Sequence, residues 1–484
     1  MSKVMTAEKL RKLDAKRQKE IRKWEKQKAK PKVRFYFAYL VLVISLIYVT
    51  DEVASQIGTL MKTEIANDLF AKYGESSVGL LDLLSVLAVP IPALGLLYRP
   101  LADRWGRKKF LIINTFGMSL AMFVIFLSGN IALYFIGACM VQFFIPHDMH
   151  VVYIMESAPP KHRARVYSAI KFFANMGVML IPLLRRYLMH DASEWRAVYF
   201  IPALVGVIVS FIALLTARET DAFIDSRLRY LRMSDAEREA EKAKKSTENA
   251  QGGLIPALKF AMSHKQLRWL YITSALINIG FFVTINYQVI LSYGYACNYV
   301  DNGFFASLGD EVMNAVSVGP VTDALFMFPI GSAVAQVLMG FVSDSKGRKT
   351  AAIVTAVNCT LAFIGFAVGS RAAWPPYLVG FLCGACIGSS YATNDVLIMM
   401  IGESSPTNLR SSTMSAQFIV TAVGVVISYA VGLPTISVLG NSAAGAVSFA
   451  LLVPGYIAAF FALVRKTHDT RGIDMDTVTG SEWD

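Results

Sequence analysis

The chain has 484 residues, of which 55% are hydrophobic and only 17% are charged, and its mean hydropathy is +0.47. Soluble proteins carry roughly 25% charged residues, so this composition excludes a disordered protein, a fibre and a secreted disulfide scaffold. The net charge of +12 lies mostly in residues 1–34, which hold fourteen Lys/Arg and four Asp/Glu. No folded basic domain follows them, so a nucleic-acid partner is not expected.

Apolar runs with short polar breaks predict twelve membrane-spanning helices. About 20 apolar residues cross a bilayer, and each backbone polar group there must be satisfied within its own element. The first six runs are 35–57, 77–98, 109–129, 131–155, 165–189 and 195–217. The second six are 267–291, 319–342, 350–370, 376–402, 414–436 and 444–465. The predicted fold class is an all-α membrane protein with two six-helix bundles.

The runs also predict where the chain divides and how it is oriented. The expected parts are a basic tail (1–34), an N-terminal bundle (35–217), a linker with helical character (218–266), a C-terminal bundle (267–465) and a C-terminal tail (466–484). Three of the polar breaks are basic, namely RPLADRWGRKK, PPKHRAR and SDSKGRK. With twelve spans they lie on the same side of the membrane as the basic tail. The positive-inside rule then predicts that this side, and with it both termini, is cytoplasmic. The loop 58–76 is then an outer loop, and RRYLMHDASEWR is an exception, because it is basic on the outer side.

Two motifs occur once in each half and in the same order. LADRWGRKK and VSDSKGRKT share D-x-x-G-R-K after the second run of each half. Residues 156–163 and 403–410 both read E-S-x-P-x-x-x-R after the fourth run. This repetition indicates a duplicated six-helix unit. Two such halves that face each other around a midplane site form the architecture of a large transporter class.

These residues resemble the major facilitator superfamily. Residues 340–349 fit its G-x-x-x-D-x-x-G-R-K loop at every fixed position, whereas the first copy has Arg99 in place of the leading glycine. The E-x-x-P-x-x-x-R repeats, and DTRGIDMD at 469–476, look like those of the sugar-porter and organic-ion branches. The resemblance covers about residues 35–476. It implies a transporter in the cell (inner) membrane.

The loop motifs are interpreted as gating parts rather than solute ligands. Carboxylate–guanidinium pairs at helix ends can hold the cytoplasmic side closed and separate when the two halves move. Such a pair contributes little binding energy when it is exposed to water and more when water is excluded. For the cations alone, the simpler interpretation is orientation by the positive-inside effect. The gating candidates are Asp103, Arg104, Arg107, Glu156, Arg163, Asp344, Arg348, Glu403 and Arg410.

Ionisable groups inside the predicted spans are candidates for proton coupling, since each costs about 2.5–3.5 kcal/mol on insertion scales. Asp51 resembles the first-span aspartate of proton-coupled sugar porters, which implies that it exchanges the coupling proton, and Glu52 is a second candidate. The alternative is that this span ends early and leaves both acids in the outer loop. His147 is a further proton-responsive candidate. Its spacing to His150 is too weak a signal for a metal site, and none is expected.

Other polar residues at the depth of the midplane are candidates for solute binding. Asp148 and Asp395 are related by the internal repeat, as are His147 and Asn394. Lys171 occupies the position at which the sugar porters have a sugar-binding glutamine. This resemblance implies that Lys171 binds an anionic group of the solute or neutralises Asp148 or Asp51. The alternative is a lysine whose ammonium group extends to the membrane interface. The remaining solute-binding candidates are Asn286, Gln288 and Tyr391.

The expected function is secondary active transport by alternating access, with proton-coupled symport of a small polar organic solute. Lys171 favours a solute with a carboxylate. Alternatives are a proton-antiporting exporter of organic cations or zwitterions, a sugar or polyol porter, and a membrane sensor that does not transport. The sequence has no Walker A loop and no hydrolase motif, so neither an enzyme nor a cofactor is expected. The expected partners are the solute, protons and the lipid bilayer.

Overall fold

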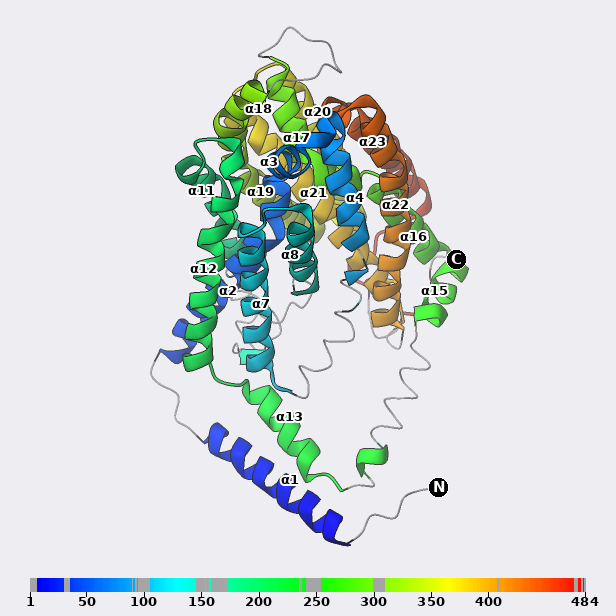
Figure 1. The fold of residues 1–484 in the computed structure, drawn as a ribbon. Helices are drawn as coiled ribbons and strands as arrows, with labels where there is room; N and C mark the ends of the chain where they lie inside the picture. Colours follow the sequence, from blue (N-terminus) through cyan, green and yellow to red (C-terminus); the bar gives the residue numbers. More distant parts are fainter. Residues whose placement is uncertain are drawn as a thin grey trace.

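The computed structural model describes residues 7–29, 35–88, 90–91, 94, 105–144, 153, 156–157, 170, 172–234, 237–240, 254–298, 310–406, 409–473, 478–479 and 482. Every regular element within these ranges is a helix (Figure 1). Most of these helices fall into two sets, called here the N-half (α2 to α12) and the C-half (α16 to α23).

The N-half contains α2 (Tyr36–Leu60), α3 (Lys62–Leu69), η1 (Ala71–Ser76), α4 (Ser77–Ala88), α7 (Arg107–Phe126), α8 (Ile131–Phe144), α11 (Leu180–Leu188), η5 (Ala192–Glu194) and α12 (Trp195–Thr216). The C-half contains α16 (Lys265–Asn278), α17 (Phe281–Ala296), α18 (Asp310–Val316), η6 (Ser317–Val321), α19 (Thr322–Lys346), α20 (Arg348–Arg371), α21 (Pro376–Glu403), α22 (Arg410–Leu439), η7 (Asn441–Ala443) and α23 (Ala444–Lys466). Outside the two halves lie α1 (Ala7–Lys28), α13 (Asp221–Arg232) and α15 (Leu254–Ser263).

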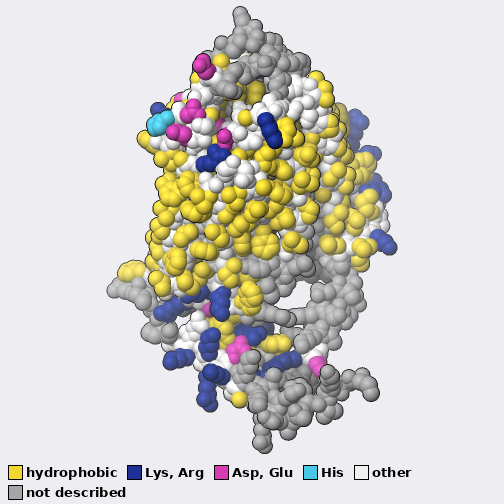
Figure 2. Space-filling view, viewed as in Figure 1, with side chains coloured by type: hydrophobic (Ala, Val, Ile, Leu, Met, Phe, Trp, Pro, Cys, Tyr) yellow, Lys and Arg dark blue, Asp and Glu magenta, His cyan; other side chains and the backbone are white. Residues whose placement is uncertain are grey.

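An apolar band crosses the face of the bundle that is drawn in Figure 2. Eight helical segments of the described chain are long and apolar enough to cross a membrane, and α4, α8 and α15 are shorter apolar helices. In Figure 2 the hydrophobic side chains form a band between two ends where charged side chains gather. We call the end with Arg107 and Arg348 the basic end, and the end with α3 and α18 the distal end (Figure 1).

Close packing of α19 against α21 shapes the middle of the C-half. Gly380, Gly384 and Gly388 recur at every fourth residue of α21. A Cβ atom at any of them would collide with the backbone of α19, at Ala324, Phe328 and Ser332 in turn. Small residues at this spacing allow two membrane helices to approach closely, so the polar residues farther along α21 are held beside α19.

Two segments differ from the sequence expectation. The loop predicted at 58–76 is largely helical, because α2 continues to Leu60 and α3 and η1 follow; Lys62 and Glu64 within it are buried. The N-terminal tail contains α1, whose Ile21 and Trp24 pack in a hydrophobic cluster with residues of α13 (Figure 1). The described parts of the tail and of the linker therefore pack against each other.

Candidate functional site

One cavity of about 300 Å³ lies between the two halves. We call it the interhalf cavity. Glu52 of α2 lines it from the N-half, and Tyr391 and Asp395 of α21 line it from the C-half. Its full lining is Glu52, Gln56, Asn175, Val178, Phe328, Pro329, Ser332, Gln336, Tyr391 and Asp395. The structure thus brings three predicted site residues from different halves to one cavity.

Asp51 directly precedes Glu52 on α2, but it is buried and is not among the residues that line the interhalf cavity. It belongs to the continuous helix α2 and is only 8% exposed. Because α2 continues to Leu60, neither acid lies in a non-helical loop; their depth in the membrane stays a prediction. Asp51 is therefore a buried carboxylate, and its neighbour Glu52 lines the interhalf cavity.

Asn394 is held by hydrogen bonds within the C-half. Its Oδ1 accepts a hydrogen bond from Asn278 Nδ2 at 2.9 Å, and its own Nδ2 donates to the backbone oxygen of Ser390 at 3.1 Å. The amide therefore ties α21 to α16 and is not among the residues that line the interhalf cavity.

Six predicted site residues lie outside the described residues. They are Asp103, Arg104, His147, Asp148, Arg163 and Lys171.

A buried polar network joins the two halves at the distal end. Lys62 at the start of α3 forms an ion pair with Asp82 of α4, and the two side chains are only 6% and 1% exposed. From the C-half, Asn286 Nδ2 donates to Asp82 Oδ2 at 3.1 Å. Lys62 Nζ in turn donates to the backbone oxygen of Ile285 at 2.8 Å. This ion pair of the N-half is thus bound by neighbouring residues of α17.

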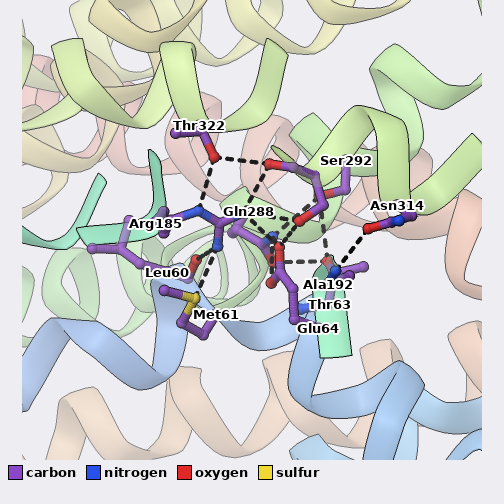
Figure 3. A network of polar contacts seen from close by, with 11 residues as sticks. Leu60, Met61, Thr63, Glu64, Arg185, Ala192, Gln288, Ser292, Asn314 and Thr322 are labelled. Carbon is purple, nitrogen blue, oxygen red and sulfur yellow. Dashed lines mark hydrogen bonds and ion pairs between the residues drawn. The ribbon is translucent and has the colours of Figure 1, made fainter. Parts of the chain in front are cut away.

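A second ion pair completes the network (Figure 3). Arg185 Nη2 lies 2.6 Å from Glu64 Oε1, and neither side chain is exposed. Gln288 Nε2 donates to Glu64 Oε2 at 3.1 Å, and the Ser317 hydroxyl donates to the same carboxylate. Arg185 Nε donates to Thr322 Oγ1 at 3.1 Å. Buried ion pairs are tolerated when further hydrogen bonds satisfy the remaining polar atoms, and here residues of both halves supply them.

Sequence reasoning missed Lys62, Glu64, Asp82 and Arg185. The signal that could have found them was the basic segment RRYLMHDASEWR on the predicted outer side, opposite a loop that carries acids. Ion pairs account for this exception. Arg185 pairs with Glu64, Arg186 Nη1 lies 3.2 Å from Asp323, and Arg196 Nη1 lies 2.6 Å from Asp68.

The structure places two predicted solute ligands in this network instead of in the interhalf cavity. Asn286 and Gln288 are fully buried. Their amides bind the carboxylates of Asp82 and Glu64. In this conformation neither residue is part of the lining of the interhalf cavity.

At the basic end, the two repeated motifs meet in one cluster of the N-half. Arg107 Nε donates to Glu156 Oε1 at 3.1 Å, and the Thr220 hydroxyl donates to Glu156 Oε2 at 2.5 Å. The backbone N–H of Lys108 donates to Glu219 Oε1 at 3.0 Å. Burial raises the pKa of the Glu219 carboxyl, although hydrogen bonds from backbone N–H groups oppose this rise.

The C-half repeats this cluster in the same geometry. Arg348 Nε donates to Glu403 Oε1 at 3.2 Å, and the Thr470 hydroxyl donates to Glu403 Oε2 at 2.5 Å. The backbone N–H of Lys349 donates to Asp469 Oδ1 at 3.1 Å. The pairs Glu219-Thr220 and Asp469-Thr470 are therefore a third repeated motif, which the sequence analysis did not identify in the first half.

Each cluster joins one half to the segment that follows its last helix. Asp344 Oδ1 lies 2.9 Å from Arg348 Nη1 and is mostly exposed, and Arg410 Nε donates to the backbone oxygen of Gly402 at 3.0 Å. These contacts tie helix ends of the same half together. A latch between the halves at the basic end stays a prediction, since Asp103, Arg104 and Arg163 are not described.

Comparison with known families and structures agrees with this architecture. A family model described as the Major Facilitator Superfamily matches residues 34–429. The xylose transporter XylE from E. coli, in an inward-open conformation, superposes with a TM-score of 0.62 at 16% identity, over 92% of this chain and 99% of that one. A nucleoside transporter, NupG, superposes with a TM-score of 0.57 at 14% identity, over 89% and 100% of the two chains.

Two curated human proteins match a shorter stretch. Facilitated glucose transporter member 7 of solute carrier family 2 is 35% identical over 130 residues, which are 26% of this chain and 24% of that protein. Member 4 of the same family is 28% identical over 141 residues, 28% of this chain and 26% of that protein. The match thus spans about a quarter of the length of these curated relatives.

Proposed function

The chain belongs to the major facilitator superfamily and is a multi-pass integral membrane protein, and from this premise we propose that it is a secondary active transporter of the cell membrane. It carries a small polar organic solute by alternating access, and protons drive the uptake. The family consists of transporters rather than enzymes, and the proposal needs no cofactor.

The observation that carries this proposal is the interhalf cavity. Its walls come from both halves, with Glu52 on one side and Tyr391 and Asp395 on the other. A solute bound there contacts both halves at once, so its binding depends on how the halves are placed. At the distal end the buried network around Lys62 and Arg185 joins the halves. This arrangement fits a carrier that is closed at its distal end.

Proton coupling is proposed for Asp51 and Glu52. Both lie on α2, one buried and one facing the cavity. A carboxylate inside the membrane is costly when charged, so proton uptake and release there can be linked to solute binding and to movement of the halves. The structural relatives include a D-xylose–proton symporter, with a TM-score of 0.59 at 16% identity, which supports the same proposal.

The described lining of the interhalf cavity favours a hydroxyl-rich solute. Glu52, Asp395, Asn175 and Gln336 offer carboxylate and amide groups, which accept hydrogen bonds from hydroxyls. The sugar-transporting relatives point the same way. A solute with a carboxylate is the second candidate, and it rests on Lys171. An exporter of organic cations is the third, and it rests on the same carboxylates.

The first experiment separates a transporter from a non-transporting sensor and identifies the solute class. The melting temperature of the purified protein is measured in the presence of sugars, polyols, carboxylates, amino acids and amines, each at two pH values. The hits are then tested for counterflow in proteoliposomes. We expect a sugar or polyol both to raise the melting temperature and to exchange across the membrane. A hit that stabilises the protein without counterflow would contradict transport and indicate a sensor.

A further inference from the structure

The charges of the distal network are unevenly divided between the halves. Each of its two buried ion pairs has both members in the N-half: Lys62 with Asp82, and Glu64 with Arg185. Among the described residues, the C-half contributes neutral groups to these pairs. They are the side chains of Asn286, Gln288, Ser317 and Thr322 and the backbone oxygens of Ile285 and Ser317.

This division decides what must break when the halves separate. Removing one partner of a buried ion pair leaves an uncompensated charge, which is strongly unfavourable. Here both partners move together with the N-half, so separation leaves each ion pair intact. Each hydrogen bond that separation breaks in this network has at least one neutral partner, and water can replace it once the interface is wet.

Gln288 of the C-half binds two neighbouring residues of the N-half in this interface (Figure 3). Its Oε1 accepts from the backbone N–H of Thr63 at 2.9 Å and from the Thr63 hydroxyl at 2.7 Å. Its Nε2 donates to Glu64 Oε2 at 3.1 Å. Two residues earlier on α17, Asn286 binds Asp82. The two amides thus bind both ion pairs.

Ser317, Thr322 and the backbone oxygen of Ile285 add buried contacts to the same ion pairs, whereas two further contacts across the distal end are exposed or neutral. Arg186 of α11 forms an ion pair with Asp323 of α19, and the two side chains are 63% and 36% exposed. Exposed pairs of this kind contribute little. Asn441 Nδ2 donates to Ser77 Oγ at 3.1 Å, a contact between neutral groups. The buried amides of α17 are therefore better placed than these contacts to hold the halves together.

We propose that Asn286 and Gln288 form a distal latch, in which neutral amides of the C-half hold two preformed ion pairs of the N-half and release them without separating charges. The proposal rests on alternating access as the proposed function. It assigns the two amides to positioning of the halves rather than to solute binding. The ion pairs serve as a fixed binding surface that remains assembled in both conformations.

The test measures the distance between the halves at the distal end, without any solute. Spin labels are placed at Lys72 of η1 and Val438 of α22, both exposed and on opposite halves. The native cysteines are replaced by alanine, and distances are measured by double electron–electron resonance in nanodiscs. The labelled protein with native Asn286 and Gln288 is expected to show mainly the short distance between the two labels.

We expect Gln288→Leu and Asn286→Leu each to raise the ratio of long to short distances about tenfold, because each loses hydrogen bonds to a charged group. Gln288→Asn, whose shorter side chain does not reach Glu64, is a second variant that keeps the site polar and should shift the ratio in the same direction. Asn358→Leu is the matched control. It removes an amide bonded to Ser389 within the C-half and should leave the distances unchanged.

Two results would overturn the latch. One is an unchanged distance distribution in the folded Gln288 and Asn286 variants. The other is a shift to long distances in Arg186→Gln but not in the amide variants. That result would show that the exposed ion pair between Arg186 and Asp323 holds the halves together. Because no solute or transport step enters the measurement, a failed uptake assay would contradict the proposed function alone and leave this test unaffected.

Discussion

At the scale of single residues, the two neighbouring acids of α2 have different surroundings. Asp51 is buried, whereas Glu52 lines the interhalf cavity. A helix turns about 100° per residue, so adjacent side chains necessarily face different neighbours. The proposed proton coupling therefore assigns a buried carboxyl to Asp51 and a carboxyl at the cavity wall to Glu52.

We expect Asp51→Asn to abolish accumulation of solute driven by a pH gradient and to leave counterflow intact. Counterflow exchanges solute without net proton transfer, so it does not need a titratable group at this position. Uptake and counterflow would be measured on the same proteoliposomes, with Asp225→Asn as the control, because Asp225 is an exposed acid of α13 outside the two halves. A variant that still concentrates solute would exclude Asp51 as the coupling group.

At the scale of helices and turns, the repeated basic-end clusters depend on glycine. Gly106 and Gly347 precede α7 and α20 with φ of 106° and 101°. A Cβ atom there would collide with the carboxylates of Glu219 and Asp469, respectively. Glycine allows both the backbone conformation and the close approach of a carboxylate that accepts hydrogen bonds at the start of the next helix.

We expect Gly347→Ala to lower stability by about 1–3 kcal/mol, the usual range for a residue forced into a sparsely populated backbone conformation. Gly340→Ala is the control, because Gly340 lies inside α19 and a Cβ atom added there would meet open space. That substitution should be neutral or stabilise by about 0.5–1 kcal/mol. Unfolding in a denaturing detergent titration would compare the two, and equal effects would contradict the role of the turn.

Hydropathy and motif repetition predicted most of the helices and both basic-end motifs, because these are local properties of the sequence. The described boundaries of α12, α20 and α23 lie within two residues of the predicted runs. The distal network was not predicted. Hydropathy assigns Lys62 and Glu64 to a loop, and the partner of Glu64, Arg185, lies 121 residues away. Burial of such charges depends on packing between distant helices, which a single sequence does not reveal.

At the scale of the whole molecule, the described structure combines a closed distal end with a cavity between the halves. The distal network joins the halves, the lining of the interhalf cavity includes carboxylates and amides, and the two acids of α2 lie one at the cavity wall and one buried next to it in the sequence. Together these features support a carrier in which solute binding, proton binding and the relative position of the halves depend on one another.

The most direct test of this account is proton movement that accompanies solute movement. Purified protein is reconstituted into liposomes that contain a pH-sensitive dye, and the solute identified by the melting panel is added outside. Symport predicts that the lumen acidifies on solute addition, and that Asp51→Asn abolishes the acidification. Solute entry without any change in luminal pH, or alkalinisation of the lumen, would contradict proton-coupled symport.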